Sequence, residues 1–164
     1  MNPIPGTDWA NFFVAEVGAS AALSGLVVVA ISINLARILE IKSLPGRAAE
    51  ALIILIGALV LTSAGLVPNQ SAAVFGALTL AIGLVMFTVT AAIQLQSPTD
   101  AQIPRWRRNI RPLMNAAASL PIIAGGMLLI LGSAGGLYWL AAGVVISLIA
   151  GVFNAWVLLI EIMR

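Results

Sequence analysis

Residues 72–96 read AAVFGALTLAIGLVMFTVTAAIQLQ, a run without a single charged side chain. A helix needs roughly 20 apolar residues to cross a hydrocarbon core of about 30 Å, and it satisfies all its backbone polar groups within the segment. This run therefore predicts a membrane-spanning helix. Similar stretches predict four more, and we expect spanning helices at about 9–36, 48–67, 72–96, 113–131 and 137–163. The predicted fold class is all-α: a polytopic membrane protein, with residues 1–164 forming a single domain, a five-transmembrane-helix bundle.

The composition of the whole chain also indicates a membrane protein. Hydrophobic residues make up 61% of the 164 residues and charged residues 9%, against roughly 45–50% and about 25% in soluble domains. The chain has neither Cys nor His. This excludes disulfides, thiolate chemistry and Ser-His-Asp catalysis, and it removes the usual ligands of zinc and haem. We therefore expect no enzymatic activity, no cofactor and no bound metal.

The positions of the cationic residues predict the orientation, because short cytoplasmic loops retain Lys and Arg. All eight lie between the first and second spans, between the third and fourth, or after the fifth: Arg37, Lys42, Arg47, Arg105, Arg107, Arg108, Arg111 and Arg164. The N-terminus is therefore expected outside the cell and the C-terminus in the cytoplasm. We expect no cleaved signal peptide, since no Lys or Arg precedes the first apolar stretch.

Glu16 lies inside the first predicted span, where an ionised side chain would cost about 2.5–3.5 kcal/mol at the bilayer centre. At 100° per residue, Ser20 and Asn34 share its face, which makes the three a candidate polar site for a proton, a cation or a polar head group. The alternative is a Glu16 satisfied by Ser20, backbone carbonyls or lipid. The opposite face carries residues typical of close helix packing, Gly18, Ala21, Ala22 and Gly25. We therefore expect neighbours on both faces, with the first helix central or at an oligomer interface.

A second group of polar residues is expected at the cytoplasmic ends of the helices, where they fall at similar depth. Its members are Arg37, Arg47, Glu50, Asn115 and Glu161. Either they form a polar cluster that closes this end, or they are interfacial ion pairs that hold helix ends together. Polar stripes on the last three spans likewise indicate either interhelical hydrogen bonds or a polar cavity.

The connection between the third and fourth spans is strongly basic. It contains Arg105, Trp106, Arg107, Arg108 and Arg111. Such a segment can lie on anionic lipids at the cytoplasmic face, at about 1 kcal/mol per basic residue, or it can dock an acidic partner. Its charge also serves to set the topology, and nucleic-acid binding is not expected from so short a patch.

Several stretches in the first half of the chain resemble a family of small bacterial multi-pass membrane proteins. They are FFVAEVGASAALSGL at 12–26, SINL at 32–35, LPGRAAE at 44–50 and LVPNQS at 66–71. Most members of that family are uncharacterised, and some carry a name that implies modulation of a membrane-bound AAA protease. The resemblance implies the bacterial cytoplasmic (inner) membrane, and it supplies no catalytic or binding residues.

Two functions remain open from the sequence. The first is a non-enzymatic membrane protein that acts by helix–helix association, as a subunit, assembly factor or modulator of a complex or as a homo-oligomer. The second is a small transporter or channel with Glu16 as its site. Abundant small-residue faces and short loops favour the first, and Glu16 together with a kink predicted at Pro121 favours the second.

Overall fold

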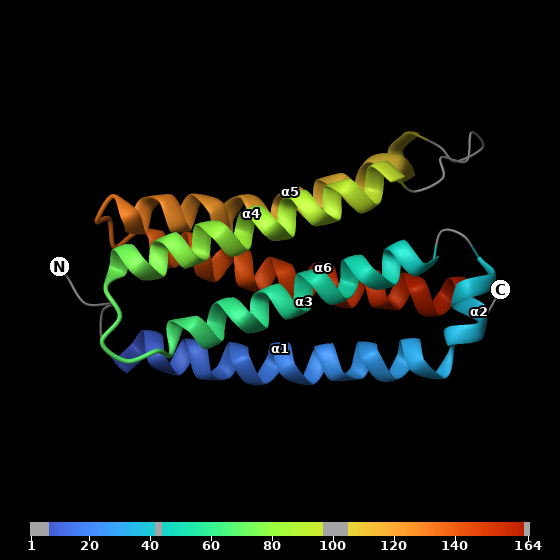
Figure 1. The fold of residues 1–164 in the computed structure, drawn as a ribbon, viewed down its shortest axis with the longest axis horizontal. Helices are drawn as coiled ribbons and strands as arrows, with labels where there is room; N and C mark the ends of the chain where they lie inside the picture. Colours follow the sequence, from blue (N-terminus) through green and yellow to red (C-terminus); the bar gives the residue numbers. More distant parts are fainter. Residues whose placement is uncertain (1–6, 42–43, 97–104, 163–164) are drawn as a thin grey trace.

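The computed structural model describes residues 7–41, 44–96 and 105–162, and the elements in these ranges are helices (Figure 1). They are α1 (Thr7–Ile33), α2 (Leu35–Glu40), α3 (Leu44–Gly65), α4 (Ala72–Gln96), α5 (Arg105–Ile130) and α6 (Gly136–Ile162). Five of them, all except α2, are long and apolar enough to cross a membrane. The prediction of an all-α chain with five candidate spans, consistent with a multi-pass membrane protein, is therefore confirmed.

The two ends of the bundle differ in their side chains. At one end, where α1 begins, Trp9 packs against Tyr138 with ring centroids 5.2 Å apart, and Phe13 packs against Phe75 at 5.7 Å. We call this the aromatic end. The other end, where α3 and α5 begin, carries Glu50 and Arg111, and we call it the arginine end. The chain runs along the bundle five times. Helix α1 therefore begins at the aromatic end and α6 ends at the arginine end (Figure 1).

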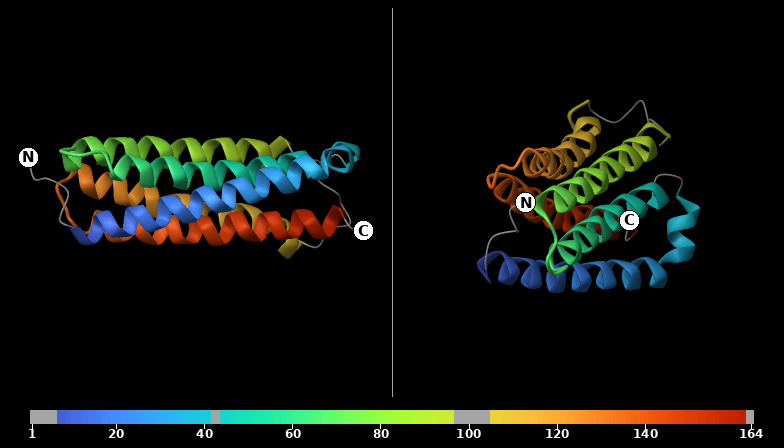
Figure 2. Two further views of the ribbon diagram at one scale, coloured as in Figure 1. Left: turned by 90° about the horizontal axis from the view of Figure 1, so that it is seen from below. Right: turned by 60° about the vertical axis from the view of Figure 1, so that its left-hand side comes forward.

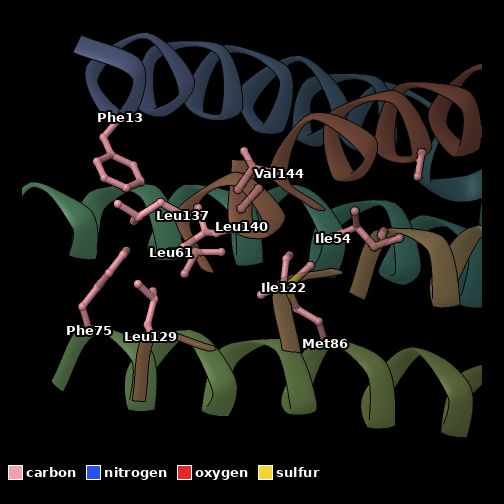
Figure 3. Packing of buried hydrophobic residues seen from close by; sticks show 13 residues of the cluster. Phe13, Ile54, Leu61, Phe75, Met86, Ile122, Leu129, Leu137, Leu140 and Val144 are labelled. Carbon is pink, nitrogen blue, oxygen red and sulfur yellow. The ribbon is translucent and has the colours of Figure 1, made fainter. Parts of the chain in front are cut away.

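Four of the helices form an up-and-down bundle. Helix α3 packs on α4 and α6, α4 packs on α5, and α5 packs on α6, so that each helix has two principal neighbours and α3 lies diagonally opposite α5. Helix α1 lies outside this group, against α3 and to a smaller extent α6 (Figure 2). The core of the bundle is apolar, with Phe75, Met86, Ile122 and Leu140 among its buried side chains (Figure 3).

Glycines set how closely these helices approach. A Cβ on Gly126 of α5 would lie 2.6 Å from the Leu80 nitrogen and 2.8 Å from the Gly76 oxygen, both backbone atoms of α4. A Cβ on Gly143 of α6 would lie 2.5 Å from a side-chain carbon of Ile122 on α5. Only a residue without a side chain allows this contact, which is the usual way in which membrane helices gain packing energy.

The helix at the second predicted span starts earlier than the expected residue 48. Helix α3 begins at Leu44 and includes Pro45 and Gly46, which precede the predicted span. Proline fits the first turn of a helix because its missing N–H has no intrahelical partner there. Leu44 is fully buried and packs with Ile38 of α2, so tertiary contact extends the helix by this turn.

The fourth predicted span is also longer than expected. Helix α5 begins at Arg105 rather than near residue 113 and continues through Pro112 and Pro121. Arg is a good helix former, so the basic segment extends the helix at its N-terminal end. The residues predicted as a loop before it, 97–104, lie outside the described part of the chain.

The first predicted span is interrupted near its end. Asn34 has φ −106° and ψ 15°, outside the helical range, and separates α1 from the short helix α2. Its side-chain amide donates a hydrogen bond to the Ala30 carbonyl at 2.9 Å, a local bond that competes with helix continuation. Helix α2 then crosses the arginine end between α1 and α3 (Figure 1), where Ile38 is buried.

Candidate functional site

The inward face of α1 is apolar at both ends and polar between them. Phe13 and Val27 are buried in contacts with the other helices, and Ser20, midway between them, is fully buried. Glu16 lies one turn before Ser20 and is partly buried, and Ser24 lies one turn after it. One carboxylate oxygen of Glu16 and the hydroxyls of Ser20 and Ser24 are buried without a hydrogen-bond partner among the described residues. Buried polar atoms of this kind call for a partner.

The predicted grouping of Glu16, Ser20 and Asn34 is therefore only partly assembled. Glu16 and Ser20 are neighbours on one face of α1. Asn34 follows Ser20 by fourteen residues, about 21 Å of helix rise, and its amide bonds to its own helix at the arginine end. These residues do not form one site.

The outward face of α1 has no neighbour in the described chain. A Cβ on Gly18 or on Gly25 would meet no heavy atom within 4 Å, and Ala21 and Ala22 between them are exposed. The expectation of neighbours on both faces is thus met on one face alone, and a central position for α1 is wrong. The helix lies at the edge because α3, α4, α5 and α6 already surround a common core.

At the arginine end an ion pair connects two helices that lie diagonally across the bundle. Arg111 of α5 donates through Nη2 to Glu50 Oε1 at 2.5 Å and through Nε to Oε2 at 3.3 Å. The Glu50 side chain is 2% exposed and that of Arg111 is 19% exposed. A two-point contact of this kind fixes the orientation of both groups and is stronger than a single hydrogen bond.

A second polar connection lies one turn deeper on α5. Asn115, which is buried, donates through Nδ2 to the Phe87 carbonyl of α4 at 3.3 Å. The hydroxyl of Ser119 donates to Asn115 Oδ1 at 3.2 Å and is also buried. Arg111, Asn115 and Ser119 therefore follow one face of α5 at intervals of four residues, and they link α5 to α3 and α4.

The predicted cytoplasmic-edge cluster is divided in the structure. Glu50 pairs with Arg111 and Asn115 bonds to the Phe87 carbonyl of α4, whereas Arg37 pairs with Glu40 on the surface of α2 at 2.9 Å. Arg47 is partly buried in the first turn of α3. Glu161 lies on α6, and its side chain is outside the described part of the structure.

The basic segment is helical where the structure describes it. Arg105, Trp106, Arg107 and Arg108 form the first turn of α5, and their side chains lie outside the described part. Arg111 departs from the interpretation as a lipid or partner contact, because its guanidinium turns inward to Glu50. Sequence reasoning missed this pair. A usable signal was present, since both charges border apolar spans and need a partner of opposite sign there.

The Arg37–Glu40 pair supplies a prediction of small effect. Its side chains are 48% and 63% exposed, so solvent screens the attraction. We expect Glu40→Gln to change the free energy of unfolding in detergent by less than about 0.5 kcal/mol. Unfolding followed by circular dichroism in mixed micelles of increasing SDS content measures this. A loss well above that value would mean that α2 depends on the pair.

The remaining chemistry is sparse. Among the described residues no group of three or more His, Cys, Asp or Glu side chains could hold a metal ion. A shallow apolar hollow of about 450 Å³ lies along α6, lined by Leu148, Ile149, Val152, Phe153 and Trp156, and it includes none of the polar residues of α1.

No known protein family, curated protein or solved structure matches the chain. The resemblance to small bacterial membrane proteins stays a prediction.

Proposed function

We propose that this chain is a non-enzymatic integral membrane protein that works by lateral helix–helix association, with the outward face of α1 as its contact surface. The observation that carries the proposal is the difference between its glycines. Gly76 and Gly126 lie closer to the backbone of the neighbouring helix than a Cβ would permit, and Gly83 and Gly143 lie against isoleucine side chains of α5. Gly18 and Gly25 on α1 lie beside the small residues Ala21 and Ala22, and no atom of the described residues comes within 4 Å of a Cβ at either position.

Small residues on a membrane helix gain their packing energy from a second helix, because lipid chains cannot follow a flat helical surface as closely. Gly18 and Ala22 are four residues apart, as are Ala21 and Gly25, so two interleaved small-residue pairs lie on this face. The partner is a second copy of the chain or another membrane protein. The absence of His and Cys from the sequence supports a role without catalysis.

We further propose the bacterial cytoplasmic membrane as the location, with the aromatic end outside and the arginine end in the cytoplasm. The sorting of all eight cationic residues to one side supports this orientation. Exposed Tyr138 and Trp139 at the aromatic end suit a membrane–water interface. The basic first turn of α5 would then contact anionic lipids of the inner leaflet.

The proposal predicts that enlarging the small-residue face blocks association without unfolding the monomer. We expect the double substitution Gly18→Leu and Gly25→Leu to reduce cross-linked or co-purified complexes by about tenfold or more, since its side chains would separate the two helices. The monomer should retain its stability, because each new Cβ enters open space. Cross-linking in native membranes, followed by purification in mild detergent and mass spectrometry, measures both self-association and other partners.

A matched control uses Ala81→Leu, which enlarges a small exposed residue on α4. This variant should associate like the parent protein. The proposal fails if the Gly18/Gly25 variant forms the same complexes as the parent, or if the parent itself is recovered as a monomer without partners.

A second function, transport of a proton or small cation, rests on a different observation. Buried oxygens of Glu16, Ser20 and Ser24, which have no hydrogen-bond partner in the described part of the chain, form a polar stretch between two apolar contacts of α1. A bound cation or a file of water molecules would satisfy them. Proton or cation flux into proteoliposomes that is abolished by Glu16→Gln would favour this function over association.

A further inference from the structure

The ion pair of Glu50 and Arg111 lies where it can control one end of the four-helix core. Helices α3 and α5 are diagonal members of the bundle and do not pack extensively on each other. A side chain that reaches across the diagonal passes through the middle of the bundle, between α4 and α6. The near-complete burial of Glu50, at 2% exposure, agrees with this central position.

The two ends of the core are held by different kinds of contact. Towards the aromatic end, α4 and α5 approach backbone to backbone at Gly76 and Gly126, and α5 and α6 do so at Gly125 and Gly136. Such contacts are rigid, because no side chain can rearrange to relax them. At the arginine end the link across the diagonal consists of two long side chains, which separate by changing rotamers.

Several buried polar residues of α5 and α4 lie behind the ion pair. Asn115 and Ser119 follow Arg111 on α5 and are buried, and Ser119 lies about 12 Å of helix rise deeper than Arg111. Thr90 of α4 is also fully buried, and its hydroxyl bonds to the Met86 carbonyl of its own helix at 2.6 Å. Water entering from the arginine end would find these hydrogen-bonding groups of α4 and α5 beside apolar side chains such as Ile54 of α3.

We propose that Glu50 and Arg111 form a latch across the diagonal of the bundle, whose release opens the arginine end of the core to water while the aromatic end stays closed. The glycine contacts of α4, α5 and α6 act as the fixed end of this movement. The inference concerns α3 and α5 and does not depend on the contact surface proposed for α1.

The natural absence of Cys from the chain permits a direct test. Ser119→Cys places a thiol of nearly the same size behind the latch, and Thr62→Cys places one at a fully buried site of α3 towards the aromatic end. Each reporter is combined with Glu50→Gln, which keeps the shape of the side chain and removes its charge. Detergent-purified protein is then exposed to a membrane-impermeant maleimide, and the rate of modification reports the population of open molecules.

We expect Glu50→Gln to accelerate modification at position 119 by about tenfold or more and to leave position 62 protected. The matched control is Glu40→Gln, the same change in the exposed pair on α2, which should alter neither rate. Unchanged protection at position 119 would overturn the latch. Equal acceleration at both positions would also overturn it, because the pair would then stabilise the whole fold without controlling one end.

A distance measurement gives a second, independent readout. Spin labels at half-buried Ala49 of α3 and exposed Leu113 of α5 report separation at the arginine end, and labels at exposed Val60 and Met127 report the same two helices toward the aromatic end. Glu50→Gln should lengthen the first distance and leave the second unchanged. Arg111→Lys, which keeps the charge but loses the two-point geometry, should give a smaller lengthening of the first distance. Equal distances in all variants would contradict the proposal.

Discussion

Replacing Arg111 by methionine should lower the free energy of unfolding by about 3–5 kcal/mol, because it leaves a buried carboxylate without its counter-charge. Glu50 is 2% exposed and accepts two hydrogen bonds from Arg111. Methionine keeps much of the volume of the arginine stem and removes both donors. The change thus measures the cost of an uncompensated charge more than the loss of packing.

The double variant Glu50→Leu, Arg111→Met distinguishes the destabilisation caused by an unpaired buried charge from a requirement of the fold for the ion pair itself. Apolar replacement of both partners of a buried ion pair is often neutral or stabilising, so the double variant should recover most of the loss. SDS-driven unfolding of purified protein, followed by circular dichroism, gives the four free energies of the cycle. Arg37→Met, at an exposed pair, is the control and should have little effect.

The expectation would be wrong if Arg111→Met lay within about 1 kcal/mol of the parent protein, the range of a solvated surface pair. It would also be wrong if the double variant were as unstable as the single one. That result would show that the volume and shape of the two side chains matter and their charges do not.

Gly126→Leu should be nearly as damaging, with an expected loss of about 3 kcal/mol, at the upper end of the usual range for overpacking. Its Cβ would lie 2.6 Å and 2.8 Å from backbone atoms of Leu80 and Gly76, and backbone cannot rotate away as a side chain can. Helices α4 and α5 would have to move apart along this contact. The same unfolding measurement applies, and a broadened transition would indicate loosened packing of the pair.

Gly25→Leu is the matched control, since it makes the same chemical change within an apolar helix at a position where none of the described residues lies within 4 Å of the new Cβ. In monomeric protein at low concentration it should be neutral or slightly stabilising, because a helical glycine is less favourable than a residue with a side chain. An equal loss of unfolding free energy in both variants would contradict this expectation. It would mean that the α1 face is already occupied within the folded chain, or that helix propensity and not helix–helix contact determines the loss.

The existence of the spans was predictable from residues close together in the sequence. An uncharged apolar run such as 72–96 must form a helix in a membrane, since no other local structure satisfies its backbone. The boundaries were less predictable. Leu44 and Arg105 begin their helices earlier than the pattern indicates because burial of Leu44 and the helical preference of Arg extend the first turns.

For the candidate sites too, the parts that lie within one helix were predictable from the sequence and the contacts between helices were not. Periodicity within one helix correctly placed Glu16 and Ser20 on a common face of α1, because neighbours on a helix surface follow from its geometry. It also placed Asn34 on that face. Residues on one face of a long helix can lie far apart along its axis, so a shared face does not make Asn34 part of the same site. The Glu50–Arg111 pair joins residues 61 positions apart, and no local pattern determines which helix lies opposite another.

Composition and charge pattern are enough to specify five apolar helices whose cationic residues lie in the first and third connections and after the last helix. These properties follow from composition and from the cost of exposing backbone and charge to hydrocarbon. Only the packing of the helices shows that α1 lies outside a four-helix core, with none of the described residues packed on its glycine face, and that Arg111 turns inward to Glu50. The physical reason is that helices in a membrane select their neighbours by the fit of whole surfaces, so that the partner of a residue depends on all four packed helices at once.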